Sequence, residues 1–156
     1  HTGDIGEIDA EGFLKITDRK KEMFKTSGGK YIAPAVLENQ MKQSLFIEQI
    51  MVVGAGRKMP AALIQLNLEH AINWLKENNI ICDSLKNAIK EPLLFEAIEK
   101  EINLHNQNFG SWEQIKKIKL TPDEWTIDDG HLTPTMKLKR KVVSEKYKEL
   151  IDQIYS

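Results

Sequence analysis

The sequence has few of the residues that crosslink proteins or bind zinc, and it has no long apolar run. Cys82 is the only cysteine among the 156 residues, so the chain cannot form an internal disulfide. The four histidines lack the close spacing of zinc ligands; they are His1, His70, His105 and His131. No apolar run approaches the roughly 18 residues of a transmembrane helix, and the first residues lack the pattern of a signal peptide. These absences argue against a disulfide-rich secreted domain, a zinc module and a membrane-spanning protein.

The charge of the chain is balanced rather than one-sided. Its 22 basic and 23 acidic residues give a net charge of −1, so no overall field attracts a polyanion and we expect no nucleic-acid partner. The composition, 41% hydrophobic and 29% charged, is typical of a soluble globular protein, and the length suits one domain with a real core. The chain opens on His-Thr-Gly-Asp without a methionine, from which we expect a piece of a longer protein.

Positive charge is concentrated locally, in residues 17–30. This stretch holds five cations and ends in Gly28 and Gly29. Glycine tolerates positive φ and lets a ligand or a neighbouring domain approach the backbone closely. Residues 22–25 and 30–32 can pair as a hairpin across this turn. The alternative interpretation is a solvated, charged hairpin whose lysines bind nothing.

The middle of the chain has the pattern of an α+β domain. Pro34 is a typical first helical residue, and apolar side chains follow it at helical spacing over residues 34–44. The β-branched run at residues 47–53 and the run at 61–66 predict two antiparallel strands. We therefore expect a small mixed sheet flanked by helices and preceded by a two-stranded hairpin. Further along we expect helices at residues 70–78 and 92–109, an edge strand at 115–120, and a final helix from Lys139.

A second basic segment covers residues 132–141, and a third candidate stretch lies near the start of the chain. Pro134 disfavours helix in the residue before it, so we expect the second segment to be extended where it approaches Lys137. Near the start, Asp4 follows Gly3, and we expect it to be an exposed carboxylate in a loop. Asp4 is either a turn-forming residue or part of a binding site.

Together, the three stretches resemble the adenylate-forming enzyme superfamily of acyl-CoA synthetases, beetle luciferases and peptide-synthetase adenylation domains. The opening His-Thr-Gly-Asp resembles the family's (S/T)GD motif. Residues 16–34 resemble the motif that spans the interdomain hinge and the glycine turn. Leu-Thr-Pro-Thr-Met-Lys-Leu-Lys-Arg, ending at Arg140, resembles the C-terminal motif that carries the catalytic lysine. The resemblance covers almost the whole chain.

The details resemble the long-chain fatty acyl-CoA synthetases. Many relatives have Ser-Gly-Lys at the catalytic lysine, whereas this chain has Thr-Met-Lys. The segment of about 60 residues from Glu69 to Thr126 also resembles that branch. Aligning Lys-Leu-Lys-Arg with the family's Lys-Ile-x-Arg favours Lys137 over Lys139 as the catalytic residue.

The resemblance implies a division into two parts and a two-step reaction. Residues 1–20 would be the end of a large N-terminal adenylation domain, and residues 21–156 the mobile C-terminal domain. The fatty acid first attacks ATP to give an acyl-adenylate and pyrophosphate, and CoA then displaces AMP. The implied ligands are ATP, CoA, a fatty acid and Mg²⁺ bound through ATP in the large domain. The fragment alone would be inactive.

The resemblance also implies residue roles. Asp4 and Arg19 would bind the nucleotide, and Lys21 would match the hinge. Lys137 would be catalytic in the first half-reaction. A separate set would line the channel that the pantetheine arm of CoA enters; it comprises Lys25, Gly28 and Gly29.

Two alternatives remain open at this point. The acyl group could pass to the phosphopantetheine of an acyl-carrier protein instead of CoA, by the same chemistry. Or the chain could be a non-catalytic α+β binding module whose basic hairpin docks an anionic partner. The resemblance implies a cytoplasmic parent, and a peripheral contact with the inner face of the membrane is also open.

Overall fold

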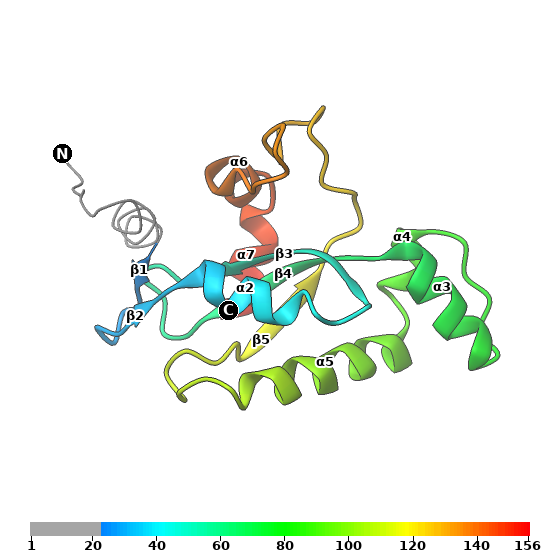
Figure 1. The fold of residues 1–156 in the computed structure, drawn as a ribbon, viewed down its shortest axis with the longest axis horizontal. Helices are drawn as coiled ribbons and strands as arrows, with labels where there is room; N and C mark the ends of the chain where they lie inside the picture. The colour runs from blue at the N-terminus through cyan, green and yellow to red at the C-terminus, as the bar shows by residue number, and fades with distance from the viewer. Residues whose placement is uncertain (1–22) are drawn as a thin grey trace, which may run out of the picture.

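The computed structural model describes residues 23–156, which form two small β-sheets with helices around them (Figure 1). The expectations for Asp4, Arg19 and Lys21 lie outside the described residues. Strands β1 (Phe24–Lys25) and β2 (Tyr31–Ile32) pair antiparallel, with Phe24 opposite Ile32. The hairpin predicted across the glycine turn is therefore confirmed.

The second sheet has three strands in the order β3-β4-β5. Strands β3 (Ile47–Val53) and β4 (Ala61–Leu66) are antiparallel, as the sequence predicted. Strand β5 (Lys117–Leu120) lies parallel to β4 at the edge, so the sheet is mixed. A parallel neighbour needs a long crossover connection, and the helical segment between β4 and β5 provides it.

In the described part of the chain, six helices surround this sheet. Helix α2 (Pro34–Met41) begins at the proline that the sequence marked as a first helical residue. It ends three residues earlier than expected, because its last turn tightens: the amide of Ser44 bonds the carbonyl of Met41. The others are α3 (Leu68–Glu77), α4 (Leu85–Ala88), α5 (Pro92–Asn106), α6 (Arg140–Lys146) and α7 (Lys148–Tyr155). None of the helices within residues 23–156 has the length and apolar character needed to cross a bilayer.

The single C-terminal helix expected from Lys139 is two helical segments. The change of direction falls at Tyr147, whose φ and ψ are −107° and 26°. Backbone hydrogen bonds continue across this point, since the amide of Ile151 still bonds the carbonyl of Tyr147 at 3.0 Å. The Tyr147 side chain is buried, and its ring lies 6.2 Å from the ring of Trp125. Packing of this aromatic residue therefore accompanies the bend.

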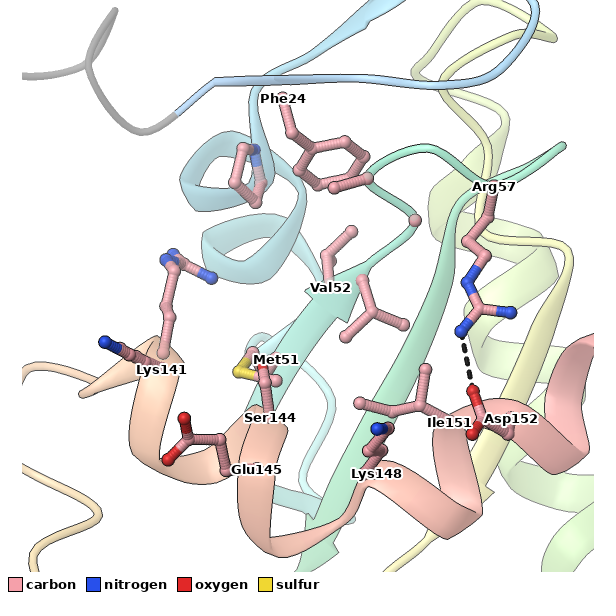
Figure 2. A pocket seen from close by; sticks show the side chains of 15 residues that line it. Phe24, Met51, Val52, Arg57, Lys141, Ser144, Glu145, Lys148, Ile151 and Asp152 are labelled. Atoms are coloured by element: carbon pink, nitrogen blue, oxygen red, sulfur yellow. Dashed lines mark hydrogen bonds and ion pairs between the residues drawn. The ribbon is translucent and has the colours of Figure 1, made fainter.

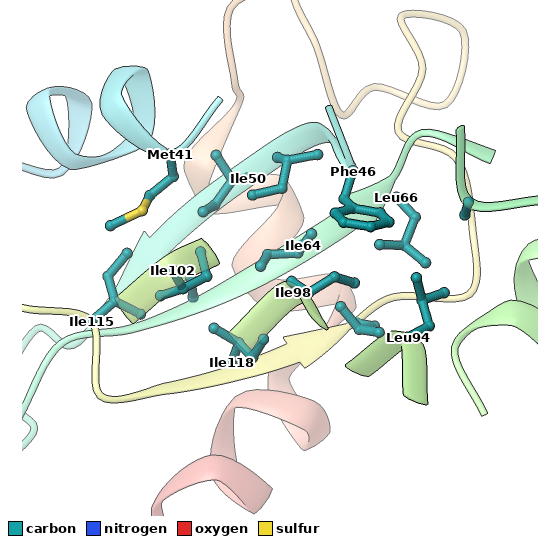
Figure 3. Packing of buried hydrophobic residues seen from close by; sticks show 14 of the residues in the cluster. Met41, Phe46, Ile50, Ile64, Leu66, Leu94, Ile98, Ile102, Ile115 and Ile118 are labelled. Carbon is teal, nitrogen blue, oxygen red and sulfur yellow. The ribbon is translucent and has the colours of Figure 1, made fainter. Parts of the chain in front are cut away.

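Both faces of the three-stranded sheet are covered. Ile50 and Val52 of β3 face one apolar cluster, together with side chains of α2 and α5. Met51 and Val53 alternate with them and face a second cluster formed with α6 and α7. Figure 3 shows the first cluster, in which isoleucines and leucines from α5 and the strands interdigitate. The domain thus has two helical layers, with the sheet between them.

Candidate functional site

Lys137 lies in a closed loop rather than an extended segment. Leu132 and Leu138 form an antiparallel bridge that brings the two ends of the loop together. The amide of Thr133 donates to the carbonyl of Lys137 at 2.8 Å, and the amide of Met136 donates to the carbonyl of Thr133 at 2.8 Å. Met136 has a φ of +66°, a left-handed conformation that lets the chain reverse within five residues. The backbone at Lys137 is therefore held by its neighbours.

The expectation of an extended segment through Pro134 was wrong. Proline restricts the residue before it, but proline itself suits the second position of a β-turn, and Pro134 occupies that position in the turn from Thr133 to Met136. The Thr133 hydroxyl oxygen accepts the amide of Lys137 at 3.0 Å and lies 3.0 Å from the hydroxyl of Thr135. The loop therefore presents the side chain of Lys137, which is exposed. Within residues 23–156 its ammonium has no salt-bridge partner.

The base of the loop is fixed by a buried histidine. The carbonyl oxygen of His131 accepts a hydrogen bond from the amide of Lys139 at 2.8 Å. The ring Nδ1 of His131 accepts a hydrogen bond from the amide of Thr126 at 3.2 Å. Its Nε2 is 3.1 Å from the Nζ of Lys146. Burial, reinforced by the positive charge of Lys146, lowers the pKa of His131 and favours the neutral imidazole. Sequence reasoning assigned no role to this residue.

An ion pair lies where the loop enters α6. The guanidinium of Arg140 donates to both carboxylate oxygens of Glu38, at 2.6 and 2.7 Å. Glu38 is only 6% exposed, and its Oε2 also accepts the amide of Val52 at 2.8 Å. Sequence reasoning missed this pair. The sequence did contain one signal for it. The acidic Glu38 directly follows Leu37 and lies one turn before Met41, and both of these neighbours are apolar residues of the same helix.

A polar hollow lies between the loop, α2 and β3. Its volume is about 330 Å³. Lys137 and Met136 line it from the loop, Glu38 lines it from α2, and Arg140 lines it from the start of α6. The remaining lining residues are Ala35, Asn39, Lys42, Gln49, Ile50 and Leu138.

The glycine turn has two positions with different requirements. Gly29 has a φ of +86°, which L side chains rarely adopt. Gly28 has no such constraint, and a Cβ placed there would meet nothing closer than the Thr26 hydroxyl at 4.0 Å. The local fold therefore favours glycine at position 29, whereas nothing among the described residues requires glycine at position 28.

The hairpin is tied to the turn between β3 and β4. The carbonyl of Lys25 accepts the amide of Gly56 at 2.9 Å, and the amide of Ser27 donates to the carbonyl of Arg57 at 2.7 Å. The Lys25 ammonium lies 5.6 Å from the ring centroid of Tyr31, on the neighbouring strand. The predicted hairpin therefore holds Lys25, Gly28 and Gly29 close together.

The structure does not bring Lys137 to the glycine turn. Figure 1 places the β1–β2 hairpin and the loop before α6 at separate edges of the domain, with α2 next to the hairpin and α6 next to the loop.

A larger cavity of about 610 Å³ opens between the end of β3 and helices α6 and α7 (Figure 2). Met51, Val53 and Ile151 supply apolar lining. At one side Arg57 Nη2 lies 2.6 Å from Asp152 Oδ1. Of the site residues predicted from sequence and described by the structure, none lines this cavity.

Within residues 23–156, no three His, Cys, Asp or Glu side chains come together as a metal-ligand set would.

Comparison with known proteins gives one family match and close relatives. Residues 22–156 match the family described as AMP-binding enzyme C-terminal domain. The chain is 41% identical over 156 residues to the long-chain-fatty-acid–CoA ligase FadD15 of Mycobacterium tuberculosis, covering 99% of this chain and 26% of that protein. It is 36% identical over 165 residues to the human long-chain-fatty-acid–CoA ligase 6, covering 100% of this chain and 23% of that protein. The chain thus spans about a quarter of the length of these relatives.

A solved structure shares the fold. The adenylation domain of a carboxylate reductase from Mycobacterium chelonae superposes with a TM-score of 0.72, at 21% sequence identity. The match covers 88% of this chain and 20% of that one. The mixed sheet, its flanking helices and the preceding hairpin therefore form a fold that this adenylation domain shares.

Proposed function

The chain belongs to the family of AMP-binding enzyme C-terminal domains, and from this premise we propose that it serves an AMP-forming long-chain fatty acid–CoA ligase. Residues 21–156 form the mobile C-terminal domain, and residues 1–20 end a large N-terminal adenylation domain, which is its first partner. In the first half-reaction a carboxylate oxygen of the fatty acid attacks the α-phosphorus of ATP and releases pyrophosphate. In the second, the CoA thiolate attacks the acyl carbon and releases AMP.

Lys137 serves the first half-reaction. Negative charge develops at the α-phosphate as the new bond forms, and a preorganised ammonium there stabilises the transition state. Support comes from the combination of a tethered backbone and an exposed side chain: the Thr133 hydroxyl and the Leu132–Leu138 bridge hold the loop, while Lys137 extends outward.

The glycine turn serves the second half-reaction. A pantetheine arm that passes along a backbone needs a wall without side chains. Gly28 provides such a surface, although the local fold does not require glycine at this position. Lys25, on the same hairpin, lies near the channel and supplies positive charge for the phosphates of CoA. Gly29 fixes the shape of the turn.

The remaining assignments follow from the resemblance. Asp4 accepts hydrogen bonds from the ribose hydroxyls, Arg19 assists it, and Lys21 marks the hinge. The Mg²⁺ that accompanies ATP neutralises phosphate charge and belongs to the large domain. The fatty-acid pocket and the main phosphate-binding loop belong there too, so residues 1–156 alone are inactive. The proposal places the parent in the cytoplasm, where a peripheral contact with the membrane would supply long-chain fatty acids.

The proposal is tested on the full-length parent protein. Pyrophosphate exchange driven by a long-chain fatty acid should be present and should depend on Lys137. Thioester formation should be faster with CoA than with a phosphopantetheinylated acyl-carrier protein. Absence of exchange with all fatty acids, or a strict requirement for the carrier protein, would contradict it.

A further inference from the structure

We propose that Glu38 is a positioning residue for adenylation, which acts through Arg140 to hold the loop that carries Lys137. This inference rests on the proposed role of Lys137. It concerns a buried ion pair that joins residues 102 positions apart in the sequence.

The carboxylate of Glu38 uses both oxygens. Oε1 accepts from Arg140 Nη2 at 2.7 Å, and Oε2 accepts from Arg140 Nη1 at 2.6 Å and from the amide of Val52 at 2.8 Å. The side chain of Glu38 is 8% exposed and that of Arg140 is 30% exposed. A two-point contact of this kind fixes the direction of the guanidinium as well as its distance.

The pair connects the two helical layers around the free edge of the sheet. Glu38 belongs to α2, which packs on one face, and Arg140 begins α6, which packs on the other. Val52 lies in β3, whose outer edge has no neighbouring strand among the described residues. The carboxylate thus satisfies an open amide of the edge strand and links both layers at that point.

The ion pair lies at the start of α6. Lys139, the residue before the helix, makes no side-chain capping hydrogen bond. Below the loop, the hollow of about 330 Å³ separates Lys137 from the body of α2. Arg140 follows Lys137 by three residues, so its contact with Glu38 sets where the loop stands over this hollow.

The pair also relates the two functional elements to each other. Helix α2 begins two residues after β2 ends, so it continues directly from the hairpin that carries the glycine turn. Through Glu38 the same helix holds the loop of Lys137. A rotating domain can deliver Lys137 accurately only if the loop moves with the domain as one body, and misplacement by about 1 Å can cost a factor on the order of 10² in rate.

The test uses Glu38→Gln and Arg140→Lys in the full-length protein. In Glu38→Gln the side-chain oxygen can still accept the amide of Val52, but the neutral amide replaces the carboxylate that faces Arg140. In Arg140→Lys the positive charge remains, but the two-point contact of the guanidinium is lost. The maximal rate of pyrophosphate exchange should fall on the order of 10- to 100-fold in Glu38→Gln and by less in Arg140→Lys. Conversion of supplied acyl-adenylate to acyl-CoA should stay within about twofold of wild type in both.

A matched control is Asp152→Asn, which removes the ion pair with Arg57. That pair has the same N–O distance of 2.6 Å but is more exposed, and the variant should leave both half-reactions unchanged. Thermal unfolding of each variant, with assays run well below the transition, separates loss of folded protein from loss of positioning.

Several outcomes would overturn the inference. Equal loss of both half-reactions would make the pair a purely structural contact. Unchanged exchange in Glu38→Gln and Arg140→Lys would show that the loop does not need it. These outcomes differ from failure of the proposed function itself, in which Lys137→Ala would leave pyrophosphate exchange intact.

Discussion

The Tyr155 hydroxyl donates a hydrogen bond of 2.6 Å to the carbonyl oxygen of Met59. This contact ties the last helix to the turn between β3 and β4, and the guanidinium of Arg57 lies 4.9 Å from the ring centroid of the same tyrosine. The turn also binds the hairpin through Gly56 and Arg57. The end of the chain and the glycine turn are therefore attached to the same short segment.

Tyr155→Phe removes this hydrogen bond and keeps the ring. The carbonyl of Met59 loses a partner, so the free energy of unfolding should fall by about 1 kcal/mol. Denaturant titration of the chain and its variant measures the difference. Ser156→Ala, which removes a neighbouring exposed hydroxyl bonded only within its own helix, is the control and should change little. An unchanged unfolding free energy in Tyr155→Phe would contradict the expectation.

Stability should fall at alkaline pH through two tyrosines. Burial raises the pKa of Tyr147 to about 12, helped by the charge of Asp123, and burial raises the pKa of Tyr155 to about 12. Their ordinary pKa is about 10. Between these values the unfolded chain loses its tyrosine protons first, so their contribution to stability is complete below pH 10 and is lost as pH rises toward 12.

The check is denaturant titration across this range. A variant with Tyr147→Phe and Tyr155→Phe together should start less stable at pH 8 yet lose less stability between pH 10 and pH 12 than the wild-type chain. Parallel pH curves for the two proteins would show that other groups cause the alkaline loss.

Lys137 and Lys139 should differ sharply in the first half-reaction. In the full-length parent, Lys137→Ala should lower acyl-adenylate formation by a factor on the order of 10²–10³, since it removes one preorganised charge donor. It should still convert supplied acyl-adenylate to acyl-CoA. Lys139→Ala, the matched control, removes an exposed cation at the start of α6 and should cost about tenfold or less. Reversal of the two results would mean that the motif alignment is wrong by two residues.

Substitutions at the two glycines of the turn should distinguish a role in the CoA channel from a role in the conformation of the turn. Gly28→Trp in the full-length parent should block thioester formation and spare pyrophosphate exchange, because the side chain would fill the channel while the local fold has room for it. Gly29→Ala should instead lower the unfolding free energy by about 1 kcal/mol, since its φ of +86° penalises a side chain. Equal loss of both half-reactions in Gly28→Trp would assign the turn a structural role.

Local signals in the sequence were sufficient for most of the elements. Pro34 and Pro92 each open a helix, because proline fixes φ and its missing amide costs nothing in the first turn. The run of β-branched and apolar residues in Ile47–Val53 became a strand buried on both faces. The hairpin followed from two short runs across Gly28 and Gly29. In each case the preference belongs to residues that are neighbours in the chain.

The shape of the loop of Lys137 could not be obtained in that way. Pro134 is compatible with an extended segment and with a β-turn, and local preference does not distinguish them. The choice depends on Leu132 pairing with Leu138, and on Lys139 reaching the carbonyl of the buried His131. These contacts exist only after α6 has packed on the sheet.

The sequence by itself therefore determined the described strands, the helix starts at Pro34 and Pro92 and the glycine turn, because each depends on the conformational preference of a short stretch. The choice of Lys137 follows from the family resemblance and stays a prediction. The tertiary structure alone decided the parallel position of β5, the bend at Tyr147 and the pairing of Glu38 with Arg140. Such features join segments up to 102 residues apart. They depend on which surfaces are buried against each other and which buried charges find partners, and no single segment carries that information.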